Sequence, residues 1–75
     1  MSVKQLELIK QILATLKDRQ RHWTEFSRFM RRTYGCSEAQ FYAALTFSIR
    51  RGWVVRPSRG VYESTEKGKK FLMVM

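Results

Sequence analysis

Residues 37–68 decide the fold and read SEAQFYAALTFSIRRGWVVRPSRGVYESTEKG. Ser37 and Gln40 have the spacing of a capping box, which predicts that a helix starts here and continues toward Gly52. Two strands are predicted at residues 53–56 and 60–63, joined by a Pro-Ser-Arg-Gly turn. A helix followed at once by a basic hairpin suits nucleic acid, because the helix can fill a major groove while the hairpin reaches the adjacent backbone or minor groove.

The helix predicted at residues 37–51 has two different faces. The face centred on Phe41 holds Ala44, Leu45, Ser48 and Gly52, so it is expected to be buried. The opposite face carries small or polar side chains, namely Ala39, Ala43, Thr46 and Arg50, with Gln40 and Phe47 beside them. Small residues let a helix approach a groove closely, and the polar side chains can reach base edges.

The remaining segments complete a small helical domain. Residues 3–17 have helical periodicity, and that helix is expected to end near residues 18–20. A short extended link precedes Thr24, which is predicted to cap a second helix that stops at Gly35. Thr65 is predicted to cap a last short turn before the apolar tail at residues 71–75.

The length and composition limit what the chain can be. Seventy-five residues with an apolar share of 44% are enough for one domain, residues 1–75, with one core. One cysteine excludes an intrachain disulfide, and Cys36 and His22 give no case for a metal site. We expect no signal peptide and no membrane span, and therefore a cytoplasmic protein.

The charge of the chain favours a polyanionic partner. The net charge is +9, and the excess is concentrated in the arginine-rich residues 19–60. Arginine suits planar contacts to phosphate and guanine better than lysine does. The sequence has no glycine-rich phosphate loop, paired carboxylates or nucleophile–base set, so we expect no enzyme activity, cofactor or small-molecule ligand.

These segments resemble the winged helix-turn-helix domain of small prokaryotic and archaeal regulators. Residues 41–45 and 49–54 resemble the recognition helix and first wing strand, residues 61–68 the second wing strand and its ending, and residues 23–26 the start of the second helix. Ser48 departs from that pattern, where a larger apolar residue is expected. The resemblance implies an α+β, mainly α fold with three helices and a β-hairpin wing. It also implies double-stranded DNA as the partner.

The sequence thus predicts a DNA-binding transcriptional regulator, expected to be a homodimer. The predicted DNA contacts are Gln40, Ala43, Thr46, Phe47, Arg50 and Arg51 on the third helix, Arg56 and Arg59 on the wing, and Arg28, Arg31 and Arg32 on the second helix. Phe47 has two interpretations, a thymine contact or a dimer contact, and the first helix and the tail are alternative dimer surfaces. A protein-interaction module and a non-specific nucleic-acid binder remain alternative functions.

Overall fold

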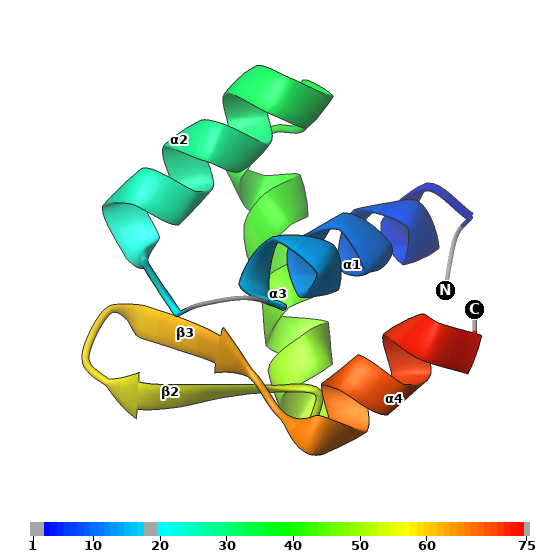
Figure 1. Cartoon of the computed structure of the whole chain (residues 1–75). Helices are drawn as coiled ribbons and strands as arrows, with labels where there is room; N and C mark the ends of the chain where they lie inside the picture. The colour runs from blue at the N-terminus through cyan, green and yellow to red at the C-terminus, as the bar shows by residue number, and fades with distance from the viewer. Residues whose placement is uncertain (1–2, 18–19, 75) are drawn as a thin grey trace.

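The computed structural model describes residues 3–17 and 20–74. In this part of the chain, four helices are combined with a three-stranded antiparallel sheet in the order β1-β3-β2 (Figure 1). The helices are α1 (Val3–Leu16), α2 (Trp23–Tyr34), α3 (Glu38–Arg50) and α4 (Glu66–Val74), and the strands are β1 (Arg21–His22), β2 (Val54–Ser58) and β3 (Val61–Ser64). The predicted end of the first helix includes residues 18–19, which lie outside the described residues.

The core lies where α1 packs across α3, with the sheet on one side and α4 near the start of α1 (Figure 1). The predicted buried face of α3 is confirmed at Phe41, Ala44, Leu45 and Ser48, which are all buried. The prediction is wrong for Gly52, which is exposed because the helix ends at Arg50. Ser48 fits there because its hydroxyl donates a hydrogen bond of 2.9 Å to the carbonyl of Ala44. The other buried apolar residues are Ile9, Ile12, Leu13, Leu16, Phe26, Met30, Trp53, Val54 and Tyr62.

The turn between α2 and α3 forms as the sequence predicts. Gly35 ends α2 in the left-handed conformation, at φ 66°, which glycine adopts without steric cost. The Ser37 hydroxyl accepts a hydrogen bond of 3.1 Å from the Gln40 amide N–H, and the Gln40 side-chain oxygen accepts one of 2.9 Å from the Ser37 amide N–H. This capping box fixes the first turn of α3.

The start of α2 differs from the prediction. The helix begins at Trp23, and its N-cap is His22 rather than Thr24. The Nδ1 atom of His22 accepts a hydrogen bond from the Thr24 amide N–H at 3.3 Å, while the Trp23 amide N–H donates to the carbonyl of Gly60 at 2.6 Å. Pairing of β1 with β3 brings Gly60 to this position, so a contact across the sheet sets where the helix begins.

The hairpin also differs in detail from the prediction. Strand β2 begins one residue later than expected and continues to Ser58, so the connection shrinks to Arg59 and Gly60. The pairing register shifts between Val55 and Ser58, a bulge that contains Pro57. Proline is tolerated there because β2 is an edge strand and the bulge needs no ladder N–H.

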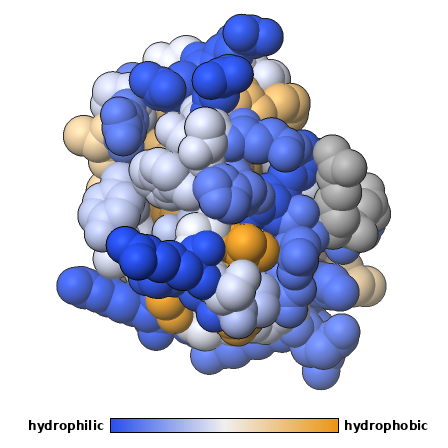
Figure 2. Space-filling model, turned by 90° about the vertical axis from the view of Figure 1, so that its left-hand side faces the viewer, coloured by the Kyte–Doolittle hydropathy of each residue, from blue (hydrophilic) through white to orange (hydrophobic). Residues whose placement is uncertain are grey.

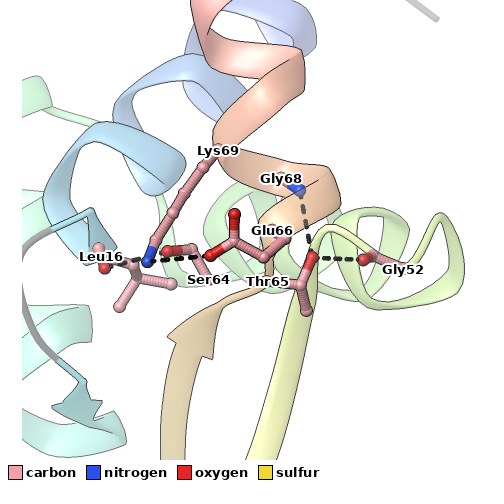
Figure 3. Close-up of polar contacts among 7 residues, drawn as sticks. All are labelled: Leu16, Gly52, Ser64, Thr65, Glu66, Gly68 and Lys69. Atoms are coloured by element: carbon pink, nitrogen blue, oxygen red, sulfur yellow. Dashed lines mark hydrogen bonds and ion pairs between the residues drawn. The ribbon is translucent and has the colours of Figure 1, made fainter.

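The C-terminal segment is a full helix, which corrects the expectation of a short turn and of three helices. Thr65 caps it, because its hydroxyl accepts a hydrogen bond from the Gly68 amide N–H at 3.0 Å and donates one to the carbonyl of Gly52 at 2.6 Å (Figure 3). The Phe71 ring stacks on Trp53 with centroids 3.9 Å apart. The arrangement is a winged helix-turn-helix fold with an added helix docked beside the end of α3.

Candidate nucleic-acid interface

The exposed face of α3 is formed by small and polar side chains. Ala39, Ala43 and Arg50 are exposed, and Thr46 is half-buried. Thr46 and Arg50 are one helical turn apart, so their side chains project from the same stripe. The two alanines leave the helix backbone accessible to a groove of a duplex.

Gln40 lies at the edge of this face, near α1. Its side-chain oxygen is already used in the capping box, so the amide NH₂ group remains to donate to a base or phosphate. Gln40 and Ala43 both line a groove of about 440 Å³ that is shared with Leu8 of α1 and with Cys36. Gln40 can therefore donate to a base at the margin of the face.

Phe47 is less available than the sequence suggests. Its ring is half-buried, with its centroid 6.0 Å from that of Trp53. The guanidinium carbon of Arg51 lies over the ring at 5.0 Å from its centroid. Phe47 thus supports Arg51, which is exposed at the end of α3, and its own ring offers little surface to a base.

Both predicted wing arginines are exposed. Arg59 belongs to the two-residue connection at the tip of the hairpin, and Arg56 lies at the bulge of the edge strand β2. A bulge increases the local twist of the strand, which re-aims the side chains it carries. The hairpin therefore presents guanidinium groups at its tip and along its free edge.

The arginines of α2 fall into two groups. Arg28 and Arg32 are one turn apart and line the same shallow groove of about 480 Å³, whereas Arg31 does not line it. The remaining lining residues of this groove are His22, Thr24, Glu25 and Phe29. His22 also pairs with Val61 of β3, so this groove lies next to the wing.

The face that holds this groove is predominantly hydrophilic. Figure 2 views the molecule from the side where Figure 1 places the start of α2 and the turn of the hairpin, and hydrophobic residues form only small spots on it. In the described part of the chain, ion pairs join Lys10 to Glu7, Arg21 to Glu25 and Lys69 to Glu66. The arginines predicted to contact DNA take part in none of these three pairs, and all of them are exposed.

Sequence reasoning missed Tyr42 as a surface residue of α3. Its side chain is 58% exposed, more than any other aromatic residue of that helix. Tyr42 follows Ala39 by three positions and precedes Thr46 by four, the spacing of neighbours on one helical face. That spacing was the signal that could have placed it with the candidate contacts.

The described residues were also searched for membrane-spanning helices and for metal sites. None of the helices in residues 3–17 and 20–74 is long and apolar enough to cross a membrane. Within the same residues, no group of three or more His, Cys, Asp or Glu side chains is placed to hold a metal ion.

Comparison with known proteins supports the fold. A scan of protein-family models finds no match, and neither does a search of curated proteins. Among solved structures, the chain is similar to a proposed transcriptional regulator from Thermoplasma acidophilum, with 28% sequence identity and a TM-score of 0.77. The similarity covers 96% of this chain and 77% of the other. The match thus extends over nearly all of this chain.

Proposed function

We propose that the chain is a single winged-helix domain that binds double-stranded DNA in a sequence-specific manner and regulates transcription. The observation that carries this proposal is the exposed face of α3, which has short side chains and carries Arg50, beside a wing whose Arg56 and Arg59 are exposed. The similar structure from Thermoplasma acidophilum, that of a proposed transcriptional regulator, supports the same class of function.

In this proposal α3 enters the major groove. Ala39 and Ala43 permit the close approach, while Thr46 and Arg50 contact base edges and Gln40 donates from its free amide group. Arginine can bond both acceptors of guanine at once, so Arg50 is the residue expected to discriminate most strongly.

The other arginines position the domain on the backbone. Arg59 reaches the minor groove or a phosphate from the tip of the wing, and Arg56 and Arg51 bind phosphates on either side of α3. On α2, Arg28 and Arg32 bind phosphate from their shared groove, and Arg31 from the adjacent side of the helix.

Three alanine variants distinguish residues that recognise bases from residues that bind phosphates and position the domain. Arg50→Ala is expected to cost about 1–3 kcal/mol on the preferred duplex and to relax base preference at one position. Arg31→Ala is expected to weaken binding equally on all sequences and to reduce the salt slope by about one. Arg59→Ala is expected to lower affinity with a modest loss of preference for A·T-rich flanks. The measurement is anisotropy titration on a duplex selected from random sequences and on its scrambled version.

A matched control is Lys10→Ala, which removes a cation paired with Glu7 on α1, outside the proposed interface. It should leave affinity for both duplexes nearly unchanged. Equal losses of specific and non-specific binding in the three arginine variants would favour a non-specific nucleic-acid binder. No change in any of them would favour a protein-interaction module instead.

We also propose that the domain forms a homodimer through the ends of α1 and α4. Met73 and Val74 are each 82% exposed in the last turn of α4, close to the start of α1 (Figure 1). Phe71 and Leu72, by contrast, pack against the core of the same protomer. Met75, also part of the predicted apolar tail, lies outside the described residues. Phe47 is a poorer dimer contact because Trp53 and Arg51 cover it.

The dimer is tested by Met73→Lys, which places like charges across the proposed contact. The same substitution should not destabilise α4, because a cation near the C-terminus of a helix is favourable. Loss of a buried methionine contact of about 1.5 kcal/mol or more corresponds to at least about a tenfold weaker dimer. Light scattering over a concentration series measures this, and Lys70→Ala on the same helix is the control. A wild-type chain that stays monomeric at high concentration would contradict the proposal.

A further inference from the structure

Tyr42 projects from α3 and is not one of the residues of the buried core. Its side chain is 58% exposed, whereas Phe41 beside it is fully buried and Phe47 is half-buried. Within the described residues no group forms a hydrogen bond with its hydroxyl. An aromatic ring that is mostly exposed on a functional face is more informative than a buried one, because packing does not account for it.

The orientation of the ring is set by the protein. Tyr42 meets the indole of Trp23 edge to face, with centroids 5.9 Å apart and planes at 84°. Trp23 is itself held against Phe41 at 5.3 Å and Tyr62 at 6.1 Å. A side chain with two rotatable bonds and a rigid support loses little entropy on binding.

The neighbours of Tyr42 on α3 are small. Ala39 precedes it by three residues and Ala43 follows directly, while Thr46 lies one turn further. Because these side chains are short, the phenol ring extends beyond them on the exposed face. Trp23 begins α2 and donates its amide N–H to the carbonyl of Gly60 in the wing, so Tyr42 lies on the side of α3 that contacts the junction of α2 and the hairpin.

We propose that the Tyr42 ring contacts the C5 methyl group of a thymine in the major groove and so makes α3 select a T·A pair at that position. This proposal rests on the proposed DNA-binding function. Thymine is the base that presents an apolar group in the major groove, and an apolar ring edge gains by covering it. Phe47, the other aromatic candidate for such a contact, is covered by Trp53 and Arg51.

The test removes the methyl group from the DNA and the ring from the protein in turn. Wild type, Tyr42→Phe and Tyr42→Ala are titrated against the selected duplex and against copies in which each thymine in turn is replaced by deoxyuridine. For wild type, one replacement is expected to weaken binding about fourfold, the factor for one buried methyl-sized group. Tyr42→Phe should keep this sensitivity, because it retains the ring. Tyr42→Ala should bind the thymine and deoxyuridine duplexes equally.

Tyr34→Ala is the matched control, since Tyr34 is 42% exposed at the other end of α2 and its loss should leave the deoxyuridine effect intact. Thermal unfolding of each variant confirms that it is folded, and Tyr42→Gln, which replaces the ring with a polar side chain that favours helices, serves if alanine unfolds the domain. Wild-type binding that no deoxyuridine replacement weakens would overturn the Tyr42 proposal while leaving the proposed function standing. Persistent sensitivity in Tyr42→Ala or Tyr42→Gln would assign the methyl contact to another residue. A wild-type protein with no preference for any duplex would overturn both proposals.

Discussion

Replacing Gly68 with alanine is expected to lower the free energy of unfolding by about 3 kcal/mol, although alanine favours helices over glycine by roughly 1 kcal/mol. Gly68 lies in α4 where the helix passes over the backbone of Trp53 (Figure 3 shows its place beside Thr65). A Cβ atom on Gly68 would stand well inside van der Waals distance of the Trp53 carbonyl oxygen and 3.0 Å from the carbonyl carbon.

The neighbouring contacts leave no room for adjustment at low cost. The same carbonyl of Trp53 accepts a hydrogen bond of 2.9 Å from the Thr65 amide N–H, and the Trp53 ring stacks on Phe71. Relieving the clash would require α4 to move away from the end of α3, which would break the hydrogen bonds that Thr65 donates to the carbonyls of Gly52 and Trp53. Each such bond contributes about 1 kcal/mol, so the loss outweighs the gain in helix propensity.

Thermal unfolding followed by circular dichroism measures the effect. A loss of about 3 kcal/mol corresponds to a decrease in Tm of roughly 12–24 °C for a domain of this size. The control is Gly35→Ala, where a Cβ would meet nothing within 4 Å and the cost comes from the positive φ of 66° alone. That variant should lose only about 1–2 kcal/mol. An unchanged or raised Tm in Gly68→Ala would contradict the close approach of α4 to Trp53.

The features that sequence reasoning predicted correctly depend on interactions within a few residues. The capping box of Ser37 and Gln40 and the glycine cap at Gly35 are read directly from spacing, and both form. The buried face of α3 also follows from helical periodicity. In each case the partner groups lie on the same or the adjacent turn, so no knowledge of tertiary structure is needed.

The features that it missed depend on contacts between distant segments. Helix α2 begins at Trp23 because the Gly60 carbonyl in the wing accepts its amide N–H. Helix α4 extends over nine residues because the Phe71 ring stacks on Trp53, which lies in a different segment of the chain and stabilises the helix. Helix propensity alone, with Gly68 in the middle, predicts only a short turn.

The candidate site shows the same division. The exposure of its arginines follows from their charge and could be predicted. The covering of Phe47 could not, because it requires the chain to turn at Gly52 and return Trp53 to the side of α3. Helical periodicity alone could have placed Tyr42 on the exposed face of α3. The contact with Trp23, which holds its ring in one orientation, could not be predicted because Trp23 belongs to another helix.

Duplex binding is expected to depend steeply on salt, with an affinity that falls by about 10³ to 10⁵ between about 50 and 200 mM monovalent salt. This range corresponds to contacts with roughly 6–10 phosphates and a log–log slope of roughly −5 to −9. The charge that would make those contacts is present and accessible. The arginines of α2, of the end of α3 and of the wing are exposed and join no ion pair among the described residues.

Variants that lack individual arginines measure how much each helix and the wing contribute to the slope of log affinity against log salt concentration. Removing Arg56 and Arg59 together should flatten the slope by up to about two units, and removing Arg28 and Arg32 together should have a similar effect if their shared groove holds phosphate. Lys69→Ala, which removes a cation paired with Glu66 on α4, should leave the slope unchanged. Anisotropy titrations at several salt concentrations give each slope. Tight binding without salt dependence would contradict a phosphate interface, because the counterions released from DNA set this slope whatever the base sequence.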